Sequence, residues 1–150
     1  MLSRFEQFAG SISTIYRYIQ KIERDEMEKH GLRGAYAQYL LAIARHPQGI
    51  TAAELGEACD KDKAAVSRVV SELLSKGLID RKGVGDNLYR ARLTLTPAGE
   101  QAARVVSKRA QTAVEAAGKG LKDEDRKVFY AVLELLSTNL QQISREGIPE

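Results

Sequence analysis

Apolar residues recur every three or four positions at the start of the chain, which is the spacing of one face of a helix. Gly31 interrupts this pattern, and a second helix is predicted over residues 32–45, before Pro47. The first helix is predicted over residues 5–28, and its apolar side carries Phe5, Phe8, Ile12, Ile15, Tyr16, Ile19 and Ile22.

The middle of the chain predicts two short helices followed by a β-hairpin. Thr51-Ala52-Ala53-Glu54 has the pattern of a capping box, in which two side chains satisfy backbone donors at the start of a helix. Asp62 is placed to cap the next helix, which runs to about residue 76 and is ended by Gly77. Alternating apolar and polar positions then predict strands over residues 78–82 and 88–95.

The last third of the chain predicts two more helices. Thr96 is a cap and Pro97 suits the first helical position, so one helix opens here and runs through Ala117. Acidic residues at the positive end of the last helix place its start at residue 123. The expected fold is mainly α with a small β-hairpin wing (α+β), a winged helix-turn-helix between N- and C-terminal helices.

The helix after Asp62 is predicted to enter the major groove of DNA, because its outer face lacks bulk and acid. Arg68 can donate two hydrogen bonds to guanine, Ser67 can contact a base edge or a phosphate, and Lys63 can reach a phosphate. The outward positions are Lys63, Ala64, Ser67, Arg68 and Ser71, and the predicted hairpin adds Arg81, Lys82 and Arg90. The alternative is a basic solvated surface, since Asp60, Asp62, Asp80 and Asp86 offset much of this charge.

The apolar stripes of the first helix and the last two are larger than the predicted helix-turn-helix and hairpin could cover. A second copy of the chain is the simplest cover, so a homodimer is predicted. Two such domains would read a pseudo-palindromic duplex with half-sites about 10 base pairs apart.

Composition narrows the function classes. The chain has 150 residues, of which 43% are hydrophobic and 29% charged, which is typical of one globular domain. A formal charge of +3 is compatible with nucleic acid without indicating it. No apolar run approaches the roughly 18 residues of a membrane span, so we expect a cytoplasmic protein that does not bind a membrane.

The residues present argue against an enzyme. One cysteine, Cys59, and two histidines far apart in sequence make a metal site improbable, and no cofactor is expected. The chain has no phosphate-cradling glycine loop, no His-Glu metal motif and no nucleophile elbow. A winged helix used only for protein contact remains the alternative to a DNA-binding one, although it should present an apolar outer face.

One stretch resembles the MarR family of transcriptional regulators. Asp62-Lys63, Val66-Ser67-Arg68 and Leu73 are similar to its recognition-helix pattern, which Lys76-Gly77-Leu78-Ile79 and Leu95-Thr96-Pro97-Ala98-Gly99 continue. The resemblance implies one domain over residues 1–150, with dimerisation helices at 1–30 and 97–150 and a winged helix-turn-helix at 31–96. It further implies a sequence-specific regulator of double-stranded DNA, a repressor released by a small molecule. Whether the chain represses or activates stays open from its residues alone.

The wing departs from the family pattern. The family usually places an Asp-Arg-Arg run at the wing tip, where this chain has Asp86-Asn87-Leu88-Tyr89-Arg90. We therefore carry the role of the wing arginine to Arg90.

The same resemblance implies an aromatic or phenolic ligand that alters DNA affinity. The candidate residues for such a pocket are Tyr16, Tyr36, Tyr39, Arg45 and His46. The alternative is that the tyrosines fill the core or an interface. Cys59, at the end of the third predicted helix, is interpreted as a small buried hydrophobe in preference to a redox switch.

Overall fold

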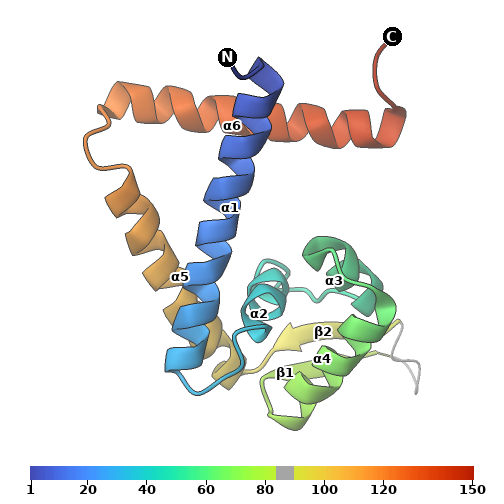
Figure 1. Ribbon diagram of the computed structural model, residues 1–150. Helices are drawn as coiled ribbons and strands as arrows, with labels where there is room; N and C mark the ends of the chain where they lie inside the picture. Colours follow the sequence, from blue (N-terminus) through green and yellow to red (C-terminus); the bar gives the residue numbers. More distant parts are fainter. Residues whose placement is uncertain (84–89) are drawn as a thin grey trace. The chain divides into compact units, whose positions relative to one another are not determined.

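The computed structural model describes residues 1–83 and 90–150. Two compact units divide the chain, Met1–Val114 and Glu115–Glu150. The described residues form six helices and one two-stranded antiparallel sheet, which confirms the predicted α+β class (Figure 1). The elements are α1 (Arg4–Lys29), α2 (Tyr36–Ala44), α3 (Ala52–Cys59), α4 (Lys63–Ser75), β1 (Ile79–Lys82), β2 (Arg92–Leu95), α5 (Pro97–Ala117) and α6 (Asp123–Glu146).

Side-chain caps fix where the two short helices begin. Thr51 and Glu54 form the predicted capping box at the start of α3, each accepting a hydrogen bond from the backbone N–H of the other. The Asp62 carboxylate accepts from the Ala65 N–H at the start of α4, also as predicted. The turn between α3 and α4 is therefore held at both of its helices by local hydrogen bonds.

Helix α4 ends at a glycine, as the sequence predicts. The N–H of Gly77 donates to the Leu74 carbonyl, and the N–H of Leu78 donates to the Leu73 carbonyl. This closure requires a left-handed residue, and Gly77 adopts a φ of 69°. The chain then turns directly into β1.

The core of the first unit lies where α2, α3 and α4 meet the sheet. Its fully buried side chains include Leu40, Ile43, Ile50, Leu55, Leu73 and Leu93. In the sheet, Ile79 pairs with Leu95 and Lys82 with Arg92, while Ile50 extends the pairing through a bridge to Leu93. The hairpin is thereby attached to the connection between α2 and α3.

Helices α1 and α5 share one end of this core. Met27 from α1 and Val106 from α5 are both fully buried. Beside them, the Glu26 carboxylate accepts a hydrogen bond from Lys29 Nζ at 2.9 Å and lies 3.8 Å from Arg109 Nε of α5. The hydrogen bond from Lys29 holds the pKa of Glu26 below its ordinary value.

The start of α5 contacts the residues that follow the end of α4. The Thr96 hydroxyl donates to the Gly77 carbonyl at 2.6 Å, and the Thr96 N–H donates to the Leu78 carbonyl at 3.1 Å. The same hydroxyl accepts the Gly99 N–H at 3.1 Å, which is the cap predicted for this helix. A Cβ on Gly99 would lie 1.9 Å from the Leu78 carbonyl oxygen, so this contact requires glycine.

Two predicted boundaries are wrong for physical reasons. The second helix begins at Tyr36 and not at residue 32, because the Leu32 N–H closes the end of α1 on the Met27 carbonyl. Strand β1 begins at Ile79, one residue late, because the Leu78 N–H closes the end of α4. Among the described residues β2 begins at Arg92; the rest of the strand predicted from residue 88 lies largely outside them.

No helix in the described part of the chain is both long enough and apolar enough to span a membrane.

Candidate nucleic-acid interface

Helix α4 has one buried and one exposed side. Val66, Val70 and Leu73 face the core and are nearly inaccessible, while Val69 is half-buried. All five residues predicted to point outward are exposed, namely Lys63, Ala64, Ser67, Arg68 and Ser71. The structure thus brings small, hydroxylated and cationic side chains together on the exposed side of this helix.

The described part of the hairpin carries further cations. Arg81 and Lys82 are exposed at the end of β1, and Arg90 is exposed where the described chain resumes. Arg92 is different, because its guanidinium donates to the Gly49 carbonyl at 3.2 Å and so attaches the hairpin to the α2–α3 connection. Of the residues at the wing tip, Asp86, Asn87, Leu88 and Tyr89 lie outside the described residues.

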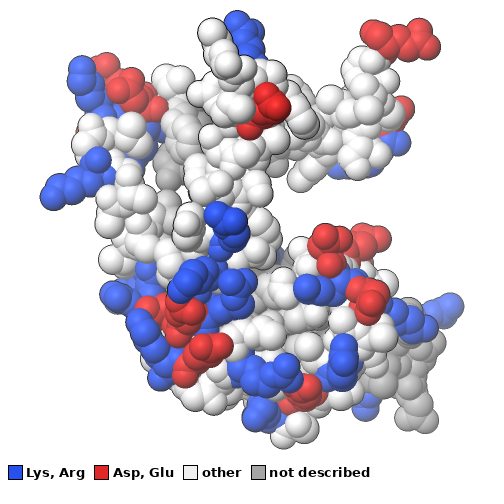
Figure 2. Space-filling view, viewed as in Figure 1, with Lys and Arg blue, Asp and Glu red and all other residues white. Residues whose placement is uncertain are grey.

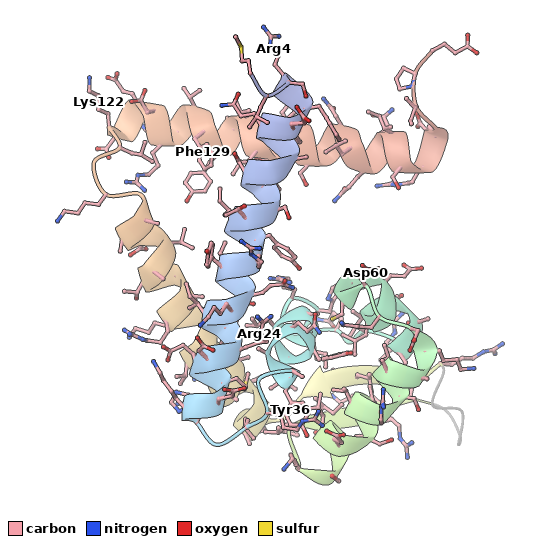
Figure 3. The ribbon with its side chains drawn as sticks, in the orientation of Figure 1. Arg4, Arg24, Tyr36, Asp60, Lys122 and Phe129 are labelled. Carbon is pink, nitrogen blue, oxygen red and sulfur yellow. The ribbon has the colours of Figure 1, made fainter. Side chains whose placement is uncertain are left out.

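Charge on this part of the molecule is mixed. Lys and Arg side chains alternate with Asp and Glu on the face that Figure 2 shows. Asp60, at the end of α3, is exposed and adopts a left-handed φ of 52° (Figure 3). Neither sign of charge dominates this face, so binding to a polyanion would depend on the positions of individual cations.

Three side chains form a polar cluster at the edge of α4 that was not predicted from the sequence. One guanidinium nitrogen of Arg33 donates to both carboxylate oxygens of Glu72, at 3.0 and 2.7 Å. The hydroxyl of Tyr36, at the start of α2, donates to the same carboxylate. Tyr36 is labelled in Figure 3. The Arg33 guanidinium also lies 5.6 Å from the centre of the Tyr36 ring.

The pKa directions within this cluster agree with its geometry. Hydrogen bonds from Tyr36 and then Arg33 hold the pKa of Glu72 below its ordinary value. Burial, and then the Glu72 carboxylate, raise the pKa of the Tyr36 hydroxyl. Glu72 is therefore ionised and Tyr36 protonated at neutral pH, as the hydrogen bond between them requires.

The candidate ligand residues separate into two groups. Arg45 and His46 both line a cavity of about 540 Å³ between the end of α2, β2 and α5. Tyr36 and Tyr39 are 1% and 2% exposed within the core, and Tyr16 is exposed on α1. None of the three tyrosines lines this cavity, whose other charged residues are Glu100 and Arg104.

A second cavity of about 600 Å³ opens between α3 and α4. Its apolar lining comes from small residues of α3 and from Val66, Val70 and Leu74 of α4. Its polar lining has both signs of charge and consists of Glu57, Asp60, Lys61, Asp62, Lys63, Ser67 and Ser71. This cavity lies beside the exposed face of α4.

Cys59 lies at the edge of the core. Its side chain is buried, and its Sγ donates to the Gln38 carbonyl at 3.6 Å. Burial raises the pKa of the thiol, which disfavours the reactive thiolate. Within the described ranges no group of His, Cys, Asp or Glu is arranged to hold a metal ion.

A capped helix-turn-helix followed by a basic hairpin, with an exposed polar face on the second helix, defines a winged helix-turn-helix protein. A sequence model of the MarR family matches residues 30–87, which span α2 to the hairpin. Over these residues the chain is similar to the MarR family.

Solved structures share this fold over nearly the whole chain. A MarR transcriptional regulator from Methanosarcina mazei Go1 is 25% identical, with a TM-score of 0.77, covering 95% of this chain and 94% of that one. A Staphylococcus aureus MarR in complex with salicylate and kanamycin is 25% identical, with a TM-score of 0.73 and coverage of 91% and 92%. A MarR-family regulator from Listeria monocytogenes, complexed with 26mer DNA, is 21% identical, with a TM-score of 0.73 and coverage of 100% and 99%. A comparison with curated proteins gives no match.

Proposed function

We propose that this protein is a transcriptional regulator that binds double-stranded DNA in a sequence-specific manner. The observation that carries the proposal is the exposed side of α4, where Ser67, Arg68 and Ser71 project away from a helix whose other side is core. A helix of this kind fits the major groove, where arginine is suited to guanine and hydroxyl groups to base edges. The DNA complex of the Listeria relative supports this function for the shared fold.

The contacts divide between the helix and the hairpin. Arg68 reads base edges, while Lys63 and Ala64 lie at the start of α4, where a phosphate can approach the helix N-terminus. Arg81, Lys82 and Arg90 bind the sugar-phosphate backbone beside the groove. These residues bind DNA without carrying out a reaction on it, so the proposed protein is not an enzyme. Its proposed place of action is the cytoplasm, where chromosomal DNA is accessible to it.

This division of labour predicts two kinds of variant. Arg68→Ala should cost about 1 to 3 kcal/mol of discrimination between a duplex from the region upstream of its own gene and a scrambled duplex. The double change of Arg81 and Lys82 to alanine should instead weaken binding to both duplexes alike. It should also lower the slope of log affinity against log salt by about 0.9 for each phosphate that the variant no longer neutralises. Fluorescence-anisotropy titrations across a salt series measure both quantities.

Identical behaviour of the two variants would contradict this assignment. If the wild-type protein binds neither duplex at low salt, the second candidate function gains support. That candidate is a winged helix used for protein contact, and the apolar cavity between α3 and α4 is the observation that favours it.

A homodimer is the proposed binding form. Large apolar side chains are exposed on α1 and again on α6, including Phe5 and Ile15 on the first and Phe129 and Leu135 on the second. Surfaces of this kind are covered in most proteins, and a second copy of the chain supplies a matching surface with two-fold symmetry. The dimer would present two α4 helices to half-sites of a pseudo-palindrome, and as a repressor it would occlude the promoter.

A small aromatic or phenolic acid is the proposed releasing ligand, and the cavity lined by Arg45 and His46 is its proposed site. The cavity combines apolar side chains such as Leu41 and Leu95 with the cationic Arg45 and Arg104, and the Staphylococcus aureus relative was solved with salicylate. Salicylate at about a hundredfold excess over its Kd should stabilise the protein by about 2.7 kcal/mol. The change Arg45→Ala should remove most of this stabilisation, measured as a shift of Tm.

The matched control is Lys108→Ala, on α5 but not among the residues that line this cavity. If Arg45→Ala and Lys108→Ala respond equally to salicylate, the ligand does not occupy this site.

A further inference from the structure

Glu72 is a negatively charged residue on the helix that is proposed to contact DNA. It lies one turn after Arg68 on α4, where a carboxylate facing phosphate would repel the partner that the helix is built to meet. Its side chain is 33% exposed, so it lies at the boundary between the exposed and buried sides of the helix. A carboxylate at this position needs a reason other than contact with DNA.

The partners of Glu72 come from outside the helix-turn-helix. Arg33 lies in the connection between α1 and α2, and Tyr36 opens α2. The Tyr36 ring is fixed, because it is 1% exposed within the core and only its hydroxyl reaches outward to the carboxylate. A hydrogen bond from such an immobile donor holds Glu72 at a defined position relative to α2.

This contact fixes the rotation of α4 about its own axis. Consecutive residues of a helix lie about 100° apart around the axis, so the direction of one side chain sets the direction of all the others. Holding Glu72 toward Tyr36 therefore sets the directions of Ser67, Arg68 and Ser71. The apolar side of α4 is anchored in the core by Val66, Val70 and Leu73. Val69 and Leu74 are only partly buried, so the bond to Tyr36 adds a fixed polar contact at the edge of this side.

Arg33 has a second effect on the same carboxylate. Arg68 and Glu72 are four residues apart on α4, which is the spacing at which opposite charges attract each other along a helix. Arg33 already engages both oxygens of Glu72, at 3.0 and 2.7 Å. This engagement weakens the pull of Glu72 on Arg68 and leaves the Arg68 guanidinium available to a base.

We propose that Glu72 is a positioning residue for DNA recognition, held by Tyr36 and Arg33 so that α4 presents its reading face in one orientation. The proposal rests on the DNA-binding function proposed above. The ion pair itself is exposed, with the Arg33 side chain 62% accessible, so it contributes little to stability. Its effect is on the geometry of the helix.

Substitution of Glu72 distinguishes a positioning role from a purely electrostatic one, because the two predict different changes in DNA binding. The change Glu72→Ala removes a negative charge, so electrostatics alone predicts equal or tighter binding to every duplex. Positioning predicts instead that the ratio of affinities for a preferred and a scrambled duplex falls about tenfold, because base contacts on α4 lose their alignment. Glu72→Gln keeps a hydrogen-bond acceptor for Tyr36 and should retain most of the discrimination.

The matched control is Glu57→Ala, which removes a carboxylate from the exposed side of α3. It should raise affinity for both duplexes equally and leave their ratio unchanged. The preferred duplex is the one of about 30 base pairs that the wild-type protein enriches from a randomised library, long enough for two half-sites. Anisotropy titrations of the full chain measure the ratios.

A second measurement requires no DNA. Hydrogen exchange followed by mass spectrometry should show faster exchange in α4 (Lys63–Ser75) for Glu72→Ala than for the wild type, with α3 unchanged. Tyr36→Phe should show the same change to a smaller extent, and it serves as the milder variant if Glu72→Ala fails to fold.

The two experiments test the positioning role of Glu72 separately from the proposed DNA-binding function. A wild-type protein that selects no duplex contradicts the proposed function, and the exchange of α4 still tests whether Glu72 holds the helix. If the wild type discriminates and Glu72→Ala discriminates equally well, with unchanged exchange of α4, the positioning role is wrong.

Discussion

At the scale of the residue, Gly99 has the most crowded surroundings of the described glycines. Any side chain at this position would meet the Leu78 carbonyl oxygen at 1.9 Å, and backbone atoms held in a hydrogen-bonded turn cannot move aside. We expect Gly99→Ala to destabilise the protein by about 3 kcal/mol, at the upper end for overpacking. Urea unfolding followed by circular dichroism measures this change.

Gly10 provides the control for that measurement. It lies on α1 with nothing within 4 Å of an added Cβ, so Gly10→Ala should stabilise the helix by up to about 1 kcal/mol. Equal effects of the two changes would show that the close approach at Gly99 is relieved at low cost. The sequence alone shows a glycine at position 99 but not the carbonyl that faces it.

At the scale of the element, the sequence predicts those helix starts and ends that depend on residues close together in the chain. The capping box at Thr51, the cap at Asp62 and the glycine closure at Gly77 each involve residues within five positions of one another, and the structure confirms all three. The predicted starts of α2 and β1 are wrong because a backbone N–H expected to enter the new element closes the preceding helix instead.

Contacts between distant segments could not be predicted in the same way. Glu72 meets Arg33 and Tyr36, which precede it by 39 and 36 positions, and periodicity places Glu72 on a helix without naming its partners. The ligand candidates show the same limit. Helix α2 is buried at seven of its residues, Tyr36, Ala37, Tyr39, Leu40, Leu41, Ala42 and Ile43, so its pattern does not reveal which of them face the core and which the cavity.

At the scale of the whole molecule, the exposed apolar residues of α6 make assembly testable. Leu135 is 59% exposed, and in a monomer Leu135→Glu should change stability by no more than about 0.5 kcal/mol. In the proposed dimer the same change places a charge in an apolar interface, so the dimer should dissociate at micromolar concentration. Sedimentation equilibrium measures the mass of the assembly.

Thr138→Glu adds the same charge on the side of α6 that carries Lys127, Glu134 and Arg145, and should leave the assembly intact. The wild-type dimer should also unfold at a temperature that rises with protein concentration, because association is linked to folding. A wild-type protein that sediments as a single chain would refute the dimer without affecting the fold of either unit.

The joint between α4 and α5 has a mechanical consequence. Thr96 bonds the end of one helix to the start of the other, and the close approach at Gly99 leaves no slack between them. The start of α5 and the end of α4 are therefore coupled by direct contacts. A displacement of α5 at this joint would move the end of α4, and with it the exposed side of that helix.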